Sequence, residues 1–206
     1  MNHADTMLRE LNHRVKNNLQ IIVSLMNLKS RMLPPERRED IRFLQEHVQS
    51  MAVAYRLVYD SGEMAEVPVG ALLREVVAEL RQIARLDPAN VRMVGDAIEE
   101  MMGLDQAISF GLFLAVLLPG YFDHARECGG RVTVATSETS RMVTCAVAGS
   151  WGTSIEFDPL RLQLRAAYIG QLKADVLPSA DPSELRLRFA LDSNRPNVSR
   201  SILERL

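Results

Sequence analysis

One histidine near the start of the chain stands among side chains that could handle a phosphoryl group. His13 is followed by Arg14 and Lys16, and Asn17 comes four residues after it. A neutral imidazole nitrogen is suited to in-line attack on phosphorus, and cationic side chains beside it can stabilise the charge of a phosphate. Four residues are about one helical turn, so the Asn17 amide could donate a hydrogen bond at the same place. These residue types and spacings predict a phosphoryl-accepting site.

A helix is the element that must position His13. Apolar residues recur at spacings of three and four, which predicts an amphipathic helix. The stripe consists of Leu8, Leu11, Val15, Leu19, Ile22 and Met26. At about 100° per residue His13 lies roughly 150° from this stripe, so we expect it to face away from the core. Arg9, Lys16, Asn17 and Gln20 should project on the same outward side. From periodicity alone, a solvated helix face with an incidental histidine would look the same.

A second helix should follow and fold back on the first. Pro34 and Pro35 cannot continue a helix and predict a tight turn. Beyond them, apolar side chains recur in heptad-type steps from Ile41 to Val58. The short connection makes the two helices antiparallel. Because two helices cannot enclose a core, we expect a second copy of the hairpin to complete a four-helix bundle in a homodimer.

Helical and strand patterns alternate through the rest of the chain. Helices are predicted over residues 69–86, 105–123 and 159–173, and strands over 91–94, 131–136, 142–148 and 185–191. This order predicts a small α/β sandwich over residues 66–192. It would follow a helical-hairpin dimerisation and phosphotransfer domain over residues 1–62, and residues 193–206 would form a tail. The expected fold class is α+β.

The composition is that of an ordinary globular protein, with 47% hydrophobic and 24% charged residues. The formal net charge of -2 argues against a generic nucleic-acid-binding protein. Cys128 and Cys145 have neither metal-binding nor redox spacing, which favours a reducing cytoplasm. The N-terminus has no signal-like pattern, and the longest apolar run, residues 107–122, is interrupted by glycine and proline. We therefore expect a cytoplasmic protein without a membrane span.

The segment around His13 also carries a family resemblance. Residues 10–20 read ELNHRVKNNLQ and are followed by IIVSLMNLKSR. This segment closely resembles the phospho-acceptor box of the bacterial sensor histidine kinases of the HisKA_2 type, neighbours of the HWE kinases. The resemblance implies that His13 is phosphorylated, that Asn17 flanks the phosphoryl group, and that Arg14 and Lys16 are the family's basic positions. It further implies a DHp-like dimeric bundle followed by an ATP-binding domain of the GHKL type.

The chemistry of that ATP-binding domain is missing from the sequence. The family's magnesium- and phosphate-binding box aligns with residues 115–125, where Ala115, Val116 and Gly120 replace asparagine, glutamate and asparagine. Pro119 stands in the middle of this predicted helix and removes a backbone hydrogen bond. Residues 147–152 contain no acidic residue that could bind the adenine amino group. Residues 160–172 align with a glycine-rich box, but Gly170 is the only glycine among them. The expectation is a degenerate GHKL-type sandwich that binds no nucleotide.

Together these observations predict a histidine phosphotransferase that relays phosphoryl groups between receiver-domain aspartates of response regulators in a bacterial two-component phosphorelay. Arg9, Glu10 and Gln20 are the expected docking residues around His13, and Glu10 could also fix the imidazole tautomer. No cofactor or metal is expected in this chain, because the receiver would supply the magnesium. Two alternatives stay open: an ATP-dependent histidine kinase with a divergent nucleotide site, and a scaffold that binds a receiver without using His13.

Overall fold

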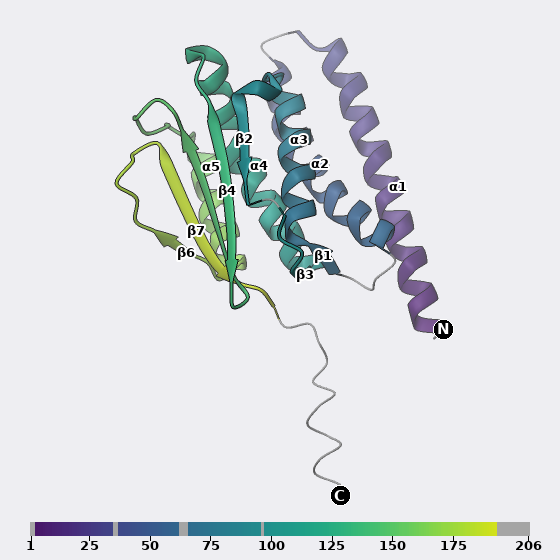
Figure 1. Cartoon of the computed structure of the whole chain (residues 1–206). Coiled ribbons are helices and arrows are strands. Elements are labelled where there is room, and N and C mark those ends of the chain that lie inside the picture. Colours follow the sequence, from purple (N-terminus) through teal and green to yellow (C-terminus); the bar gives the residue numbers. More distant parts are fainter. Residues whose placement is uncertain (1–2, 35–36, 62–65, 96, 193–206) are drawn as a thin grey trace, which may run out of the picture.

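A hairpin of two long helices opens the chain in the computed structural model, which describes residues 3–34, 37–61, 66–95 and 97–192. The helices are α1 (His3–Met32) and α2 (Arg38–Ser61). In the turn between them the Arg37 amide donates to the Pro34 carbonyl at 3.0 Å. Glu39 and Asp40 then lie in the first turn of α2, where carboxylates stabilise the helix dipole. Helix α1 stands at one side of the molecule and packs along α2 (Figure 1), so the predicted hairpin is confirmed.

The remaining described residues form helices packed on a five-stranded sheet. The helices are α3 (Val69–Ala84), α4 (Leu104–Cys128) and α5 (Pro159–Gln171), with a short 3-10 turn, η2 (Pro88–Asn90). The sheet has the order β2-β4-β5-β7-β6 and consists of β2 (Val91–Val94), β4 (Val132–Thr139), β5 (Met142–Gly149), β7 (Glu184–Ala190) and β6 (Asp175–Leu177). Strand β2 pairs parallel with β4, and the other pairs are antiparallel. Two short strands, β1 (Glu66–Pro68) and β3 (Met101–Gly103), form a separate antiparallel ribbon.

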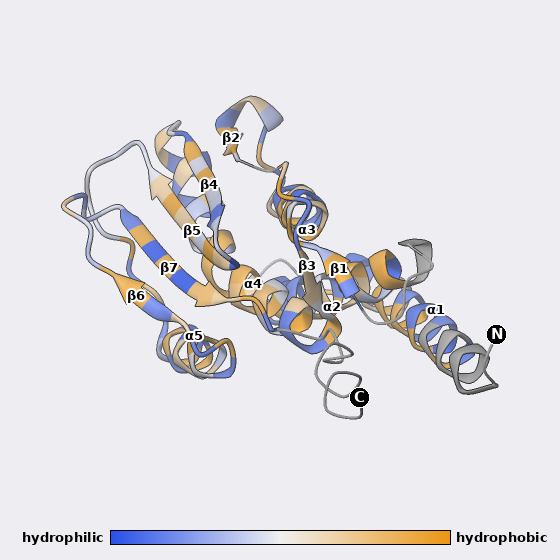
Figure 2. Cartoon of the chain, turned by 60° about the horizontal axis from the view of Figure 1, so that its bottom comes forward, coloured by the Kyte–Doolittle hydropathy of each residue, from blue (hydrophilic) through white to orange (hydrophobic). Residues whose placement is uncertain are grey.

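Helix α4 is the central helix of the α/β part. Most of its side chains are buried, and its ribbon is predominantly orange in the hydropathy view (Figure 2). Among the described residues it is the one helix with the length and hydropathy of a membrane span. However, 67% of its most apolar 18-residue window is buried inside the structure, as in the core helix of a globular fold. Gly129, at φ 71, ends the helix in the left-handed conformation that favours glycine.

Helix α2 belongs to two packing layers at once. It lies between α1 on one side and α3 and α4 on the other (Figure 1). Val53, Ala54 and Val58 of α2 are buried in the same hydrophobic cluster as Phe110 and Leu114 of α4. The hairpin and the α/β part therefore share one apolar core.

The predicted α+β fold class is confirmed, and every predicted helix and strand has a counterpart within a few residues. Strand β7 alternates orange and blue along its length, the pattern by which it was predicted (Figure 2). Strands β1, β3 and β6 were not predicted, because three residues are too few to display alternation. The expected boundary between residues 62 and 66 and the expected tail at 193–206 fall on residues outside the described ranges.

Candidate functional site

The imidazole of His13 lies beside the amide of Asn17 on α1. Asn17 Nδ2 is 3.4 Å from His13 Nδ1, and both side chains are half-buried. The helix places them one turn apart, as their spacing predicted. At this distance the Asn17 amide can influence which imidazole nitrogen carries the proton of the neutral ring.

The two orientations of the Asn17 amide have opposite chemical effects. With the amide nitrogen toward the ring, Nδ2 donates to Nδ1, and the neutral ring then carries its proton on Nε2. With the amide turned over, Oδ1 accepts from the protonated Nδ1 and leaves the Nε2 lone pair free for attack. Both arrangements place the same heavy atoms in the same positions, because the amide nitrogen and oxygen simply exchange places. Only the second prepares Nε2 as a nucleophile, so Asn17 can act as a positioning residue for His13.

The other predicted site residues surround His13 without all touching it. Arg14 Nε is 2.8 Å from Glu10 Oε1, and both side chains are well exposed. Lys16 is half-buried and Gln20 is exposed. Glu10 therefore pairs with Arg14, and the Asn17 amide lies beside the imidazole; the role of Glu10 in fixing the tautomer stays a prediction. The side chain of Arg9 is outside those that the structure describes.

The predicted apolar stripe of α1 is only partly buried. Leu19 faces α2 and is buried, and Val15 and Met26 are half-buried. Leu11 and Ile22 are exposed by 56% and 42%. Helix α1 has two apolar faces, and the predicted stripe lies between them. The prediction therefore combined residues from both faces in one direction.

A second apolar row runs along the face of α1 that is turned away from α2. We call it the free stripe; it consists of Ile21, Leu25, Leu28 and Met32, and each of these side chains is more than half exposed. Counting 100° per residue, the free stripe lies about 150° from Leu19, which faces α2. On the same count His13 lies about 90° from the free stripe and about 120° from Leu19. A partner helix seated on the free stripe would therefore leave His13 on the outer surface.

Aromatic rings fill the space between the second half of α4 and the end of β5. The ring of Trp151 lies 4.6 Å from His124 and 5.9 Å from Tyr121, centroid to centroid. A Cβ on Gly120 would come within 2.7 Å of the Phe157 ring, and one on Gly149 within 2.1 Å of Trp151. Burial raises the pKa of Tyr121 to about 12. Two of the segments that align with the family's nucleotide-binding boxes, residues 115–125 and 147–152, therefore meet at these rings.

Pro119 explains a contact that joins α4 to α5. Proline has no N–H, so the Ala115 carbonyl lacks its usual helical donor four residues on. Arg161 of α5 points its Nη1 at the carbonyls of Ala115 and Val116, at 3.4 and 3.5 Å. The guanidinium thus reaches the Ala115 carbonyl, which the proline leaves without its helical donor, and it does so while buried.

The same guanidinium anchors α5 to the hairpin. Arg161 Nη2 is 3.0 Å from Glu46 Oε2, and Arg42 Nε is 3.0 Å from Glu46 Oε1. Arg42 also reaches Asp123 of α4 at 2.7 Å. The Glu46 side chain is only 1% exposed, and burial raises the pKa of its carboxyl although both arginines oppose the rise. This charge network, which the sequence did not predict, ties α2, α4 and α5 together.

The described residues contain no cluster of three or more histidine, cysteine, aspartate or glutamate side chains that could hold a metal ion. Cys145 is buried, which raises its thiol pKa to about 12, whereas Cys128 is exposed. Within the described ranges the pair His13 and Asn17, with the basic side chains around it, remains the candidate site.

Comparison with known proteins finds similarity to histidine kinases. Residues 10–84 match the model of the histidine kinase family HisKA_2, a range that includes most of the hairpin and all of α3. The sensor histidine kinase PdtaS of Mycobacterium tuberculosis and that of Mycolicibacterium smegmatis are each 27% identical over 151 residues. These alignments cover 69% of this chain but 29% of either relative, so the chain spans less than a third of their length.

The fold has solved counterparts as well. The histidine kinase domain of the blue-light activated histidine kinase EL346 from Erythrobacter litoralis superposes with a TM-score of 0.62. It is 19% identical, and the match covers 91% of this chain and 92% of that domain. The longer EL346 protein matches with a TM-score of 0.61 and 19% identity, over 93% of this chain and 61% of that chain. At such identity the likeness shows the fold alone.

Proposed function

Because this chain has the acceptor box and the fold of the HisKA_2/HWE-type sensor histidine kinases, we propose that it carries phosphate on His13 in a two-component phosphorelay. It takes the phosphoryl group from the aspartyl phosphate of one receiver domain and delivers it to the aspartate of another. The reaction takes place in the cytoplasm and needs no nucleotide on this chain.

The proposed transfer uses only side chains around His13. Nε2 attacks the phosphorus of the aspartyl phosphate in line, an N–P bond forms, and the O–P bond to the receiver's carboxylate breaks. Asn17 holds the proton on Nδ1 so that the Nε2 lone pair is available. Arg14 and Lys16 stabilise the phosphate charge once it arrives, and Arg14 can leave its exposed pair with Glu10 at little cost. Magnesium belongs to the acidic pocket of the receiver.

One observation carries the choice of phosphotransfer over ATP-dependent phosphorylation. The histidine and its neighbouring amide are present and adjacent, whereas Trp151 and Phe157 occupy the region where the family's nucleotide boxes meet. The second candidate is an ATP-dependent histidine kinase with a divergent nucleotide site. The comparisons favour this second candidate, since the curated relatives are named sensor histidine kinases.

The proposed working form is a homodimer. The free stripe is an apolar face of α1 that the chain itself does not cover. A second copy of the hairpin would bury it and complete a four-helix bundle, the arrangement that antiparallel helix pairs with apolar seams form. His13 and Gln20 would then point outward, where a receiver's acidic face can dock against the basic residues.

Radiolabelled phosphate distinguishes the candidates. Purified protein is incubated with labelled ATP and magnesium, and separately with a receiver domain carrying labelled aspartyl phosphate. His13→Ala is the test variant, and His3→Ala is the matched histidine control. Label transferred only from the receiver, and lost only in His13→Ala, supports the phosphotransferase. Label acquired from ATP alone establishes the kinase instead, and no label from either donor refutes both.

A further inference from the structure

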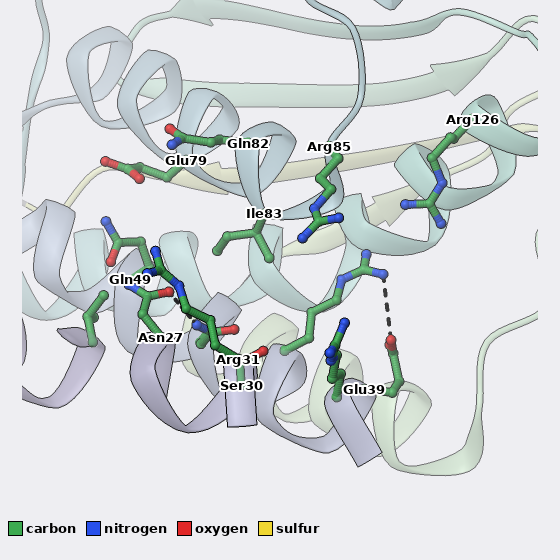
Figure 3. A pocket seen from close by; sticks show the side chains of 14 residues that line it. Asn27, Ser30, Arg31, Glu39, Gln49, Glu79, Gln82, Ile83, Arg85 and Arg126 are labelled. Atoms are coloured by element: carbon green, nitrogen blue, oxygen red, sulfur yellow. Dashed lines mark hydrogen bonds and ion pairs between the residues drawn. The ribbon is translucent and has the colours of Figure 1, made fainter. Parts of the chain in front are cut away.

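A polar groove opens between the turn end of the hairpin and the C-terminal ends of α3 and α4. Its volume is about 510 Å³, within the range of small-molecule sites. In Figure 3 Arg31, Asn27 and Ser30 reach into it from α1, and Arg85 and Arg126 face them from the other wall. Arg31 comes 18 positions after His13, which is about 27 Å along a helix. The groove is thus separate from the phospho-acceptor site.

The charges of the groove are unevenly compensated. Its lining includes five arginines, Arg31, Arg38, Arg42, Arg85 and Arg126, against the two carboxylates of Glu39 and Glu79. Both carboxylates already have cationic neighbours, because Glu39 lies 3.6 Å from Arg42 and Glu79 lies 3.7 Å from Arg56.

Three of the five guanidinium groups have no carboxylate partner among the described residues. Arg126 pairs with Asp123 at 2.8 Å, and Arg42 also pairs with acids of the buried network. The Arg38 side chain donates to the Leu33 carbonyl, and the described chain offers the guanidinium groups of Arg31 and Arg85 no hydrogen bond or ion pair. The groove therefore presents uncompensated positive charge from two different walls.

The donors in the lining define the chemistry of a matching ligand. Arginine binds carboxylate and phosphate oxygens in a bidentate manner, and every cation in this lining is an arginine. The Gln49 and Gln82 side chains add amide donors. The lining contains no aromatic ring on which a nucleobase could stack. These features suit a compact polyanion and disfavour a nucleotide.

We propose that this groove binds a compact polyanion, a short phosphate chain or a small polycarboxylate, held mainly by Arg31 and Arg85. Such a ligand would bridge α1 to the end of α3. Helix α1 packs chiefly on α2, so the bridge would restrain the helix that carries His13. This inference stands independently of the phosphotransfer proposal.

Calorimetric titration of the full chain with inorganic pyrophosphate, and separately with citrate, tests the proposal. Arg31→Gln and Arg85→Gln should each weaken binding about tenfold or more, because each removes charge-assisted hydrogen bonds. Arg85→Lys keeps the charge without the bidentate geometry and should lie between wild type and glutamine. Arg92→Gln, an exposed arginine on β2 outside the groove, is the matched control. Since the described chain offers the side chains of Arg31 and Arg85 no hydrogen bond or ion pair, the melting temperature without anion should stay close to that of wild type.

The outcomes separate cleanly. Pyrophosphate binding that the two groove variants weaken and Arg92→Gln does not supports a phosphate-type ligand. The same pattern with citrate alone supports a polycarboxylate. The proposal is overturned by the absence of binding to both anions, or by an Arg31→Gln/Arg85→Gln double variant that binds like wild type. If a glutamine variant proves unstable, Arg85→Lys decides by the same comparison.

Discussion

Replacing Arg161 by methionine should destabilise the whole protein, because the change leaves the buried Glu46 carboxylate without one of its two cationic partners. Methionine keeps the unbranched length of the side chain but removes the guanidinium that lies 3.0 Å from Glu46. Breaking a buried ion pair by removing one partner typically costs about 3–5 kcal/mol. Arg42 still faces Glu46 at 3.0 Å, so we expect the lower end, about 3 kcal/mol. For a chain of this size that is a fall in melting temperature of roughly 6–12 °C.

The loss should depend on pH with a defined sign. Burial raises the native pKa of Glu46 above its ordinary value of 4.5. When a native pKa is raised, the group's contribution to the free energy of unfolding is fully present below the unfolded pKa. That contribution is lost as the pH rises through the native pKa. Removing Arg161 removes an opposing charge and raises that pKa further. The deficit of Arg161→Met should therefore be smaller at about pH 5 than at about pH 7.5.

Urea unfolding followed by circular dichroism, at both pH values, measures the effect. Arg165→Met is the matched control: its guanidinium stacks over Phe157 at 5.5 Å but pairs with no buried acid, so its loss should cost under about 1 kcal/mol. The double variant Glu46→Leu/Arg161→Met leaves no stranded charge and should be more stable than the single variant. If Arg161→Met costs no more than Arg165→Met, or if the double variant is the less stable one, the buried pair does not hold α5 on α2.

Three further predictions concern the acceptor site, the free stripe and the thiols. Asn17→Ala should slow phosphorylation of His13 about tenfold or more, while its exposed neighbour Asn18→Ala changes the rate little; equal rates in a quench-flow assay would remove Asn17 from the mechanism. Leu25→Glu should convert the dimer to monomers in light scattering, because it places a charge on an apolar interface; an unchanged mass would mean that the stripe is not the dimer seam. In the native protein a thiol reagent should modify Cys128 quickly and Cys145 only on unfolding, since burial raises the pKa of Cys145 to about 12; two fast thiols at neutral pH would contradict this.

The parts of the site that the sequence could predict are local. His13 and Asn17 lie one helical turn apart, and their neighbourhood follows from the period of a single helix. The hairpin and the order of helices and strands followed from periodicity in the same way. The direction of the apolar stripe was less accurate, because α1 has two apolar faces and periodicity reports their average.

The contacts that join the hairpin to the α/β part could not be predicted in this way. Glu46 and Arg161 are 115 positions apart, and each lies in a helix whose pattern gives charged residues to the surface. Pro119 was the one local signal, since a proline inside a helix leaves a carbonyl without its donor. The polar groove escaped prediction as well, because its arginines come from the ends of four different helices.

Helix α2 packs both on α1 and on the α/β part, and this limits how such a protein can evolve. Its inner side, with Val53, Ala54 and Val58, is a wall of the α/β core, while its outer side supports the acceptor helix. A hairpin cut free at residue 62 would expose that wall to water, so the α/β part cannot be discarded even when it performs no chemistry. Partner choice, in contrast, can drift through the outward face of α1 without disturbing the core. The α/β part is therefore required to support the hairpin, whereas the outward face of one helix is free to vary in sequence.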